Sequence, residues 1–484
     1  MDRFTRTADI IKAYYSYKQT ADSATFVKKV CSFFDFIKDE SLSDADLNLL
    51  LFLANEAGIP QYYDLLKSKF TNAEIGDESI NSLTMSALFH DASLIRGDSK
   101  LHRYQKHVLD SFVATQRNRY VLTAPTSFGK TFLVYEIIQK MQYQNVLLIF
   151  PAISLLSENY ARLCSWEAFS DYAIHSLSEE EFDITQKNIF IFTPERFLSF
   201  MDSHQHLHFN FAFIDEVYKI DNSFVIDQET SGENERDTAY RLALEFICNL
   251  TDNMLLAGPY MALPTAETEL HKSFNDFARD NGFVFLRYNQ FEIVSKEYTT
   301  VKSRQQYIID NIPVEIGSAS KTQKIANIIL ALSSPTENTI IYCNRKSDTE
   351  SYARQLLNNQ ELISIFQERC SAVDAPVYEI FLEHLQNTFG DDWIVLKALK
   401  GRIGIHHSLV PKYIQKEIIS LFNCGALICL FSTTTITEGV NTSAKNIIIT
   451  SGKKGTKNLR QFDAKISLAE QVVSSNIIQE ELST

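Results

Sequence analysis

The chain has 484 residues, enough for two to four domains that each bury a core of their own. Hydrophobic residues make up 45% of it and charged residues 22%, a composition that excludes a mainly disordered protein. The 60 acidic and 46 basic residues give a net charge of −14, which excludes a protein that coats nucleic acid through its global charge. A local basic groove is compatible with this charge.

Seven cysteines are scattered along the chain, and an odd, scattered set does not form the framework of a disulfide-rich domain. Cys424 and Cys429 stand in a run of small apolar residues that is typical of a buried strand rather than of a metal site. The N-terminal residues lack the apolar core of a signal peptide, and no apolar run approaches the roughly 18 residues that span a bilayer. We therefore expect a cytoplasmic protein that does not interact with a membrane.

Residues 1–95 have the pattern of a helical accessory domain. Apolar residues recur at three- and four-residue spacing over 8–17 and 24–37, and 43–46 (S-D-A-D) has the composition of a helix start before 47–54. No catalytic motif stands in this part. It is expected to be an accessory domain or a surface on which a partner docks.

Two tandem α/β domains follow at 96–290 and 336–465, joined by a polar connector at 291–335. Short apolar strands alternate with helical stretches in both domains, a pattern that predicts a parallel sheet covered by helices. The strands expected in the first domain are 120–123, 145–150, 188–192, 211–214 and 253–256, and those in the second are 339–342, 403–406, 426–431 and 446–450. The predicted fold is α/β, with an α-helical domain that precedes two parallel-sheet domains in the sequence.

The segment 124–131, A-P-T-S-F-G-K-T, is the most informative stretch of the chain. It lies between an apolar strand and a run with helical spacing, the geometry that turns backbone N–H groups and a lysine toward a triphosphate. Gly129 permits the sharp turn, Lys130 is expected to bind the β and γ phosphates, and the Thr131 hydroxyl is expected to hold Mg²⁺. The other nucleotide-binding residues expected in this loop are Ala124, Pro125, Thr126, Ser127 and Phe128. The loop predicts binding of ATP or GTP.

A pair of carboxylates follows the apolar strand 211–214. At the carboxyl edge of the sheet they would lie beside the phosphate loop, with Asp215 holding Mg²⁺, directly or through water. Glu216 would orient the attacking water and take its proton. The alternative is an acidic strand end without a catalytic role, and its place after the phosphate loop argues against that interpretation.

With these motifs in this order, the chain resembles the superfamily 2 helicases over about residues 100–465. Gln105 lies at the spacing where that family places an adenine-reading glutamine, so the resemblance implies that it binds ATP. The segments F-P-A at 150–152 and T-P-E-R at 193–196 resemble motifs that touch the nucleic-acid backbone. The resemblance thereby implies nucleic-acid contacts from Pro151, Thr193, Pro194 and Arg196.

The second domain carries further segments that resemble family motifs. I-I-Y-C-N-R at 340–345 resembles the fourth motif, and T-T-T-I-T-E-G-V-N at 433–441 resembles the fifth. The resemblance implies that Glu438 and Gly439 bind ATP, that Thr433 and Asn441 contact nucleic acid, and that Thr437 couples the two. G-I-H-H-S-L-V-P at 404–411 resembles the H-H-x-G-L segment of the DExH helicases, which favours that group over the DEAD-box RNA proteins. The paired histidines there equally suit packing or capping, and neither they nor His204, His206 and His208 are assigned a metal.

Three features depart from the family pattern. Tyr218 stands where the family has His or Asp, and A-G-P-Y at 257–260 only loosely matches the Ser-Ala-Thr coupling motif. The arginine-rich sixth motif, Q-x-x-G-R-x-G-R, which supplies the arginine finger, is absent after 460–465. An arginine finger is worth on the order of 10³ to 10⁵ in rate, so we expect this chain to bind ATP but to hydrolyse it slowly.

The codons for 468–473, L-A-E-Q-V-V, can spell Gly-Arg-Ala-Gly-Arg in another reading frame if synonymous third bases are chosen freely. We hypothesise that a net one-base deletion near codon 465 produced an atypical tail at 466–484 and a helicase truncated before its sixth motif. The alternative is that the match of the second reading frame to the sixth motif arises by coincidence. The nucleotide sequence of the gene distinguishes the two.

These features together predict an ATP-dependent helicase or translocase that binds ATP between two RecA-like domains and acts on DNA or RNA. The alternatives are an ATP-dependent switch that clamps nucleic acid without moving along it, or an inactive truncated helicase. The helical N-terminal domain and the loop T-S-F-G-K-T are similar to those of helicases from bacterial anti-phage systems such as Hachiman. That resemblance implies a nuclease partner protein.

Overall fold

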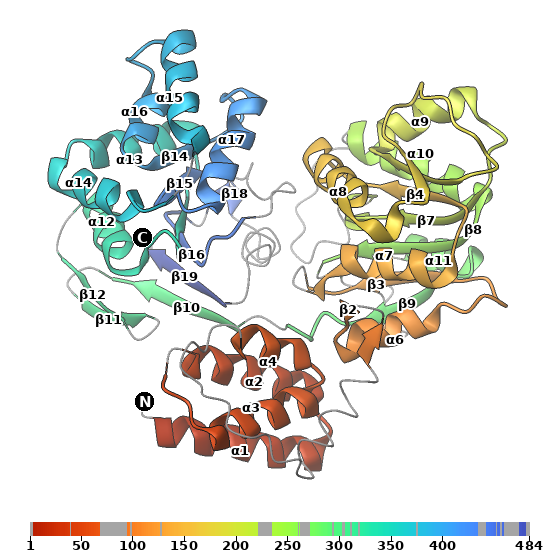
Figure 1. The fold of residues 1–484 in the computed structure, drawn as a ribbon, viewed down its shortest axis with the longest axis horizontal. Coiled ribbons are helices and arrows are strands. Elements are labelled where there is room, and N and C mark those ends of the chain that lie inside the picture. Colours follow the sequence, from red (N-terminus) through yellow and green to blue (C-terminus); the bar gives the residue numbers. More distant parts are fainter. Residues whose placement is uncertain are drawn as a thin grey trace. The chain divides into compact units, whose positions relative to one another are not determined.

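The computed structural model divides the chain into two compact units, Met1–Ile293 and Val294–Thr484, which we describe separately (Figure 1). It describes residues 3–38, 40–67, 94–96, 99–125, 128–220, 235–259, 261, 272–292, 295–302, 305–309, 312–317, 320–373, 376–433, 442–451, 453–454, 457–458 and 474–480. In these ranges, no helix combines the length and the apolar character that a bilayer crossing requires.

Four helices open the first unit: α1 (Arg3–Thr20), α2 (Ser23–Ile37), α3 (Asp44–Ala57) and α4 (Pro60–Lys67). The helices expected at 8–17 and 24–37 are confirmed, and both are longer than the sequence predicts. The expected helix start at 43–46 is a capping box, in which the Ser43 side chain accepts the Asp46 N–H and Asp46 accepts the Ser43 N–H at 2.8 Å. Gly58, at φ 74°, ends α3 in the left-handed conformation that a helix C-terminus favours.

A seven-stranded parallel sheet forms the centre of the first unit. Its order is β5 (Tyr172–His175), β6 (Lys187–Phe192), β4 (Asn145–Ile149), β7 (Phe209–Ile214), β8 (Thr251–Gly258), β3 (Arg119–Thr123) and β9 (Val284–Arg287). All five strands that the sequence predicts are present. The two strands that the prediction omits, β5 and β9, are the edge strands: β5 has only Tyr172 and His175 buried, and β9 has no buried side chain.

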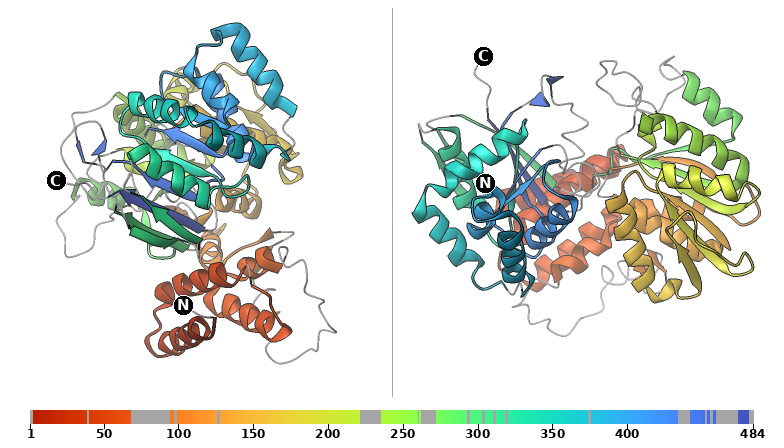
Figure 2. Two further views of the ribbon diagram at one scale, coloured as in Figure 1. Left: turned by 90° about the vertical axis from the view of Figure 1, so that its left-hand side faces the viewer. Right: turned by 90° about the horizontal axis from the view of Figure 1, so that it is seen from above.

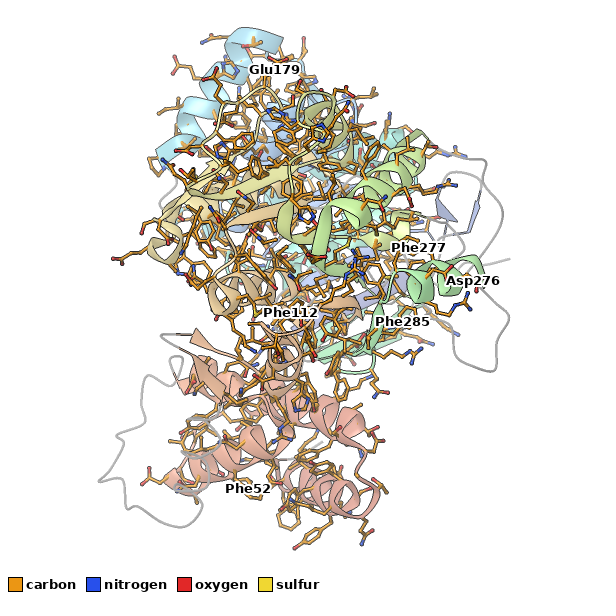
Figure 3. All side chains as sticks on the ribbon, turned by 90° about the vertical axis from the view of Figure 1, so that its right-hand side faces the viewer. Phe52, Phe112, Glu179, Asp276, Phe277 and Phe285 are labelled. Carbon is orange, nitrogen blue, oxygen red and sulfur yellow. The ribbon has the colours of Figure 1, made fainter. Side chains whose placement is uncertain are left out.

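Helices cover both faces of this sheet (Figure 2). Side chains of α9 (Pro194–Ser203), α10 (Glu235–Leu250) and α11 (Lys272–Asp280) join one face in a single hydrophobic cluster, bordered by Phe277 and Phe285 (Figure 3). For α7 (Lys130–Met141) and α8 (Ile153–Ser165), the strand order and the usual right-handed crossover imply the opposite face. Shorter elements of this unit are β1 (Ile95–Arg96), β2 (Ser99–Lys100), α6 (Arg103–Ser111), η2 (Glu167–Phe169) and η3 (Val217–Ile220).

The second unit is built on a six-stranded parallel sheet. Its order is β10 (Ser295–Val301), β19 (Ser474–Glu480), β16 (Asn446–Ile449), β13 (Thr339–Tyr342), β15 (Cys429–Ser432) and β14 (Ile403–His406). The helices are α12 (Lys321–Leu332), α13 (Lys346–Leu357), α14 (Gln360–Cys370), α15 (Pro376–Phe389), α16 (Ile394–Lys400) and α17 (Lys412–Asn423). Two antiparallel pairs complete it, β11 (Gln305–Ile309) with β12 (Ile312–Ile316) and β17 (Lys453–Lys454) with β18 (Lys457–Asn458).

The four strands expected in the second domain are present, although the third begins at Cys429 rather than at 426.

The stretch 291–335, which the sequence predicts to be a connector, contains β10, the β11–β12 pair and α12. Ile325 and Ile329 of α12 belong to the hydrophobic core of the second unit, because they lie four residues apart on one helix face. Within the tail, 474–480 forms β19 between β10 and β16, and the other tail residues, 466–473 and 481–484, lie outside the described ranges. Cys429 is buried in β15 while Cys424 is exposed at the end of α17, so a shared buried strand is wrong for Cys424.

The fold is therefore α/β, with two RecA-like parallel-sheet domains and helices that precede the first sheet in the chain, as the sequence predicts.

Candidate nucleotide-binding site

Two motifs of the first unit meet at the carboxyl edge of its sheet. The phosphate loop leaves β3, and the carboxylates Asp215 and Glu216 follow β7. Strand β8 lies between them, paired with β3 on one side and β7 on the other. Ligands of open parallel sheets bind at this edge, so the topology brings the predicted phosphate and metal residues to one place.

The phosphate loop is held by backbone hydrogen bonds at its start and end. The Ala124 N–H donates to the Gly258 carbonyl at 3.3 Å, and the Phe128 N–H donates to the Pro125 carbonyl at 3.1 Å. Gly129 then takes φ 74° and caps α7, a left-handed conformation that costs other residues energy. Thr126 and Ser127 lie outside the described residues.

Lys130, the first residue of α7, folds its side chain back into the loop. Its ammonium donates to the carbonyls of Ala124 at 3.2 Å and Pro125 at 3.0 Å, and the residue is buried. Backbone carbonyl oxygens are uncharged acceptors, and anionic phosphate oxygens are stronger acceptors for an ammonium. The side chain therefore occupies the position from which it would bind a phosphate. Thr131 follows in the first turn of α7 and is half-buried.

The two carboxylates stand at a bend in the backbone. The Asp215 N–H donates to the Ile149 carbonyl at 3.0 Å, and the Asp215 carboxylate accepts the Glu216 N–H at 2.9 Å. Glu216 is buried and has φ 48°, a conformation that is uncommon outside glycine. Such strain is stored at functional sites more often than elsewhere. Tyr218 follows in η3, within the same turn.

Side chains at the start of helix α6 form hydrogen bonds with the phosphate loop. Gln105 donates its amide N–H to the Phe128 carbonyl at 2.9 Å and accepts the His102 backbone N–H at 3.1 Å. The His102 Nε2 also lies 3.1 Å from the Phe128 carbonyl. Gln105 thus contacts the loop directly, while adenine reading by Gln105 stays a prediction.

His102 is not predictable from residue preferences, because histidine is not among the residues preferred at a helix N-cap. The available signal was its place three residues before a glutamine at a helix start, which is the spacing of a capping box. Burial of the ring lowers the pKa of His102 to about 4, so the imidazole is neutral at pH 7.

The residues of the first unit expected to contact nucleic acid lie at the same sheet edge and have structural partners there. Thr193 caps α9 by accepting the Arg196 N–H at 3.4 Å, and Pro194 occupies the first turn. The Arg196 guanidinium donates to the Ser176 carbonyl at 3.1 Å. Pro151 is buried just after β4. Contact of these four residues with nucleic acid stays a prediction.

Motifs of the second unit converge at the carboxyl edge of its own sheet. The Cys343 N–H, after β13, donates to the Ser432 carbonyl at 2.8 Å, and the Thr433 N–H donates to the His406 carbonyl at 3.4 Å. The segments that resemble the fourth and fifth motifs are therefore neighbours. Four expected site residues lie outside the described ranges: Thr437, Glu438, Gly439 and Asn441.

The histidines have packing and hydrogen-bonding roles. His406 is buried in β14, and His407 accepts the Leu409 N–H through Nδ1 at 3.3 Å while its Nε2 lies 3.2 Å from the Glu350 carboxylate. The ring of His204 stacks on Phe200 at 4.3 Å, and His206 and His208 lie in the loop that follows. In the described part of the chain, no three His, Cys, Asp or Glu residues are grouped as a metal site requires.

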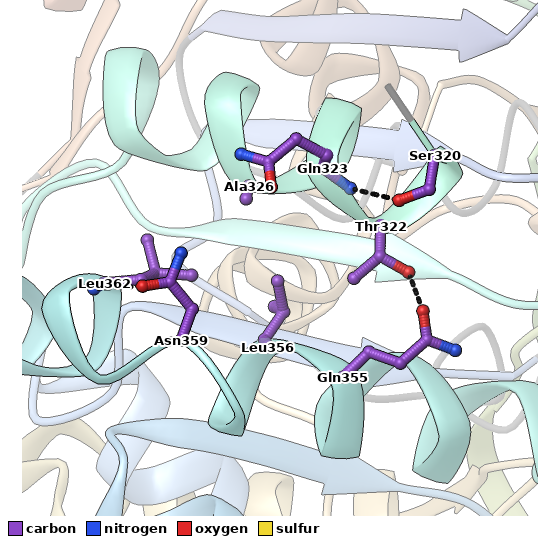
Figure 4. Close-up of a pocket in the computed structure, with 8 residues that line it drawn as sticks. All are labelled: Ser320, Thr322, Gln323, Ala326, Gln355, Leu356, Asn359 and Leu362. Atoms are coloured by element: carbon purple, nitrogen blue, oxygen red, sulfur yellow. Dashed lines mark hydrogen bonds between the residues drawn. The ribbon is translucent and has the colours of Figure 1, made fainter.

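A separate polar pocket of about 170 Å³ lies in the second unit between α12 and the α13–α14 corner (Figure 4). It contains none of the residues selected from the sequence. Its lining residues are Ser320, Thr322, Gln323, Ala326, Gln355, Leu356, Asn359 and Leu362.

Comparison with known proteins gives one family match and several relatives. Residues 98–249 match the family described as "Type III restriction enzyme, res subunit". Over 401 residues the chain is 25% identical to "Anti-bacteriophage protein B" of Escherichia coli (strain K12), covering 83% of this chain and 48% of that protein. It is 23% identical over 392 residues to the Homo sapiens protein "Helicase POLQ-like", covering 73% of this chain and 32% of that protein.

A shorter match has a higher identity. Over 71 residues the chain is 44% identical to "DExH-box ATP-dependent RNA helicase DExH9" of Arabidopsis thaliana, covering 14% of this chain and 6% of that protein. The chain spans about half the length of the Escherichia coli relative and about a third of the human one.

Proposed function

We propose that this chain, whose core is that of a superfamily 2 helicase of the DExH type, is an ATP-dependent helicase or translocase acting on nucleic acid. The observation that carries the proposal is the placement of Lys130 in the arc of the phosphate loop, one strand away from Asp215 and Glu216. An ammonium and a carboxylate pair at one sheet edge suit a triphosphate and its metal ion.

The described residues fit ATP and Mg²⁺. The Lys130 ammonium would exchange its two carbonyl acceptors for phosphate oxygens, and the α7 N-terminus would add backbone N–H donors. The Thr131 hydroxyl and the Asp215 carboxylate would hold Mg²⁺, which neutralises charge on the phosphates. Glu216, at its backbone bend, would orient the attacking water and accept its proton.

A nucleic-acid-stimulated ATPase assay tests this proposal. Wild-type chain, Lys130→Ala and Glu216→Gln are each incubated with MgATP, with and without single-stranded and duplex DNA or RNA. We expect stimulation by one nucleic acid in the wild type, a loss of more than about 100-fold for Glu216→Gln, and loss of nucleotide binding for Lys130→Ala. Wild-type chain that is not stimulated by any nucleic acid would remove the translocase assignment.

A second candidate is a switch that binds nucleic acid in an ATP-dependent way without moving along it. The observation that favours it is Tyr218 in η3, which stands where the resemblance to the superfamily 2 helicases implies His or Asp and would alter the coupling of ATP hydrolysis to the second domain. Binding of ATP and of nucleic acid that strengthen each other, without turnover, would identify the switch. A chain that binds neither would be the inactive form.

The name of the Escherichia coli relative suggests a biological setting. We propose that this chain also serves in defence against bacteriophage, together with a nuclease partner, in the reducing cytoplasm that suits its seven free thiols. Plaque counts on cells that express the wild-type chain or its Lys130→Ala variant test the defence role. Equal counts for the two strains would contradict it.

A further inference from the structure

The first turn of α6 has partners on two sides. His102 and Gln105 contact the phosphate loop, as described above. Arg103 and Tyr104, between them in the sequence, contact the C-terminal end of α3 in the N-terminal helical part of the same unit. One helical turn therefore contacts both the N-terminal helical part, which has no assigned role, and the phosphate loop.

The tautomer of His102 follows from its hydrogen bonds. Its Nδ1 accepts the Gln105 backbone N–H at 3.1 Å, so this nitrogen carries no proton. The proton of the neutral ring is then on Nε2, which donates it to the Phe128 carbonyl at 3.1 Å. The ring is buried and packs edge-to-face on the Phe128 side chain, with 4.7 Å between ring centroids.

The Phe128 carbonyl consequently accepts two hydrogen bonds from α6, one from each side chain of the capping box. In a planar trans peptide the C=O and the following N–H point in opposite directions. Fixing the Phe128 carbonyl toward α6 therefore fixes the Gly129 N–H away from α6. Backbone N–H groups of this loop are the donors that bind phosphates.

The other side of the turn is anchored to backbone carbonyls at the end of α3. The Arg103 guanidinium donates to the carbonyl of Asn55 at 3.1 Å and that of Glu56 at 3.5 Å, and its N–H donates to the Gly58 carbonyl at 2.9 Å. The Tyr104 hydroxyl donates to the Ala57 carbonyl at 3.4 Å. The last carbonyls of a helix lack partners within it, so these bonds satisfy α3 while they hold α6 in place.

We propose that His102 is a positioning residue for the nucleotide: it orients the Phe128–Gly129 peptide for phosphate binding, from a helix turn anchored on the N-terminal helical part. It raises the affinity for ATP without touching ATP. The inference rests on the proposed function, because it concerns the same loop.

The test uses His102→Asn in the full chain. Asparagine keeps the cap, since its side-chain oxygen takes the place of Nδ1, but it has no atom at the position of Nε2. Affinity for a fluorescent ATP analogue with Mg²⁺ is measured by titration, and folding by the melting temperature. Loss of one neutral hydrogen bond predicts binding weaker by about 3- to 10-fold with a melting temperature close to that of the wild type.

Asn359→Ala is the matched control, because Asn359 caps α14 in the second unit by accepting the Leu362 N–H at 3.1 Å. It should lower the melting temperature and leave the affinity unchanged. Equal affinities of His102→Asn and the wild type would overturn the inference. If the wild type itself binds no better than Lys130→Ala, the proposed function fails instead.

Arg103→Ala keeps the inference testable if His102→Asn does not fold. The Arg103 side chain contacts α3 and not the loop, so its loss should weaken nucleotide binding by about 2-fold or more through α6 alone. An Arg103→Ala chain that is folded and binds with wild-type affinity would overturn the anchoring of α6.

Discussion

At the residue scale, the candidate nucleotide site depends on a few backbone conformations that the sequence only partly reveals. Gly129 was selected from the motif, and its φ of 74° gives the physical reason for glycine there. Glu216 was selected as an acid, but its φ of 48° could not be read from the order of amino acids. His102 was missed because its role depends on the loop packed against it, 26 residues away in the sequence.

Replacement of Gly129 by alanine should cost both stability and nucleotide binding. The left-handed backbone strains any other residue by about 1 to 2 kcal/mol, and a Cβ at Gly129 would lie 2.6 Å from the Gln105 amide nitrogen. Relief of that overlap needs a shift of Gln105 or of the loop. We expect a loss of unfolding free energy in urea of about 2 kcal/mol and ATP affinity reduced by 10-fold or more.

Gly282→Ala separates the two effects. Gly282 has φ 72°, but the space where its Cβ would lie is open. An alanine there would therefore bear the backbone strain without a steric overlap. It should lose about 1 kcal/mol of unfolding free energy and bind ATP normally. If both variants bind ATP as the wild type does, the close approach of Gln105 to the loop has no role in binding.

At the element scale, buried central strands and their following motifs were predictable, and elements at the margins were not. Strands β3 and β4 are buried along their whole length, and each contains a short apolar run, Y-V-L in β3 and V-L-L-I in β4. The edge strand β9 is half-exposed. Helix α12 lies in a stretch that the sequence predicts to be a polar connector. The adjacency of motifs on β13, β14 and β15 depends on strand order, which needs the tertiary structure.

The end of α10 supplies a prediction at this scale. The buried Arg119 guanidinium donates to the Cys248 carbonyl at 2.7 Å and the Thr251 carbonyl at 2.6 Å, where α10 passes into β8. Arg119→Met would leave these acceptors without that donor, and hydrogen bonds of charged groups contribute about 1.5 to 3 kcal/mol each. We expect a loss of about 3 kcal/mol in urea unfolding. A loss below about 0.5 kcal/mol would contradict this role.

At the scale of the whole molecule, two buried histidines make stability depend on pH. Burial lowers the pKa of His102 in the first unit, and of His406 in the second, to about 4, against 6.5 for an exposed histidine. Between pH 6.5 and 4 the unfolded chain therefore binds more protons than the folded chain, so stability is lost as pH falls through this window. It is unaffected by these two groups above pH 7.

Urea unfolding at pH 7 and pH 5 measures this effect. Each histidine should cost about 2 kcal/mol of unfolding free energy at pH 5. His102→Asn should remove the part that belongs to the first unit, because asparagine does not titrate. A wild type and variant that lose equal stability between the two pH values would contradict a neutral, buried His102.

At the same scale, the two units carry segments that resemble motifs of the superfamily 2 helicases, and the proposal on which the others rest is that the phosphate loop binds ATP. Thermal melting of the wild type and Lys130→Ala, with and without MgATP, tests it most directly, since a ligand at 100 times its Kd stabilises the folded state by about 2.7 kcal/mol. We expect MgATP to raise the melting temperature of the wild type and to leave that of Lys130→Ala unchanged. A wild type that MgATP does not stabilise, or a variant stabilised equally, would contradict it.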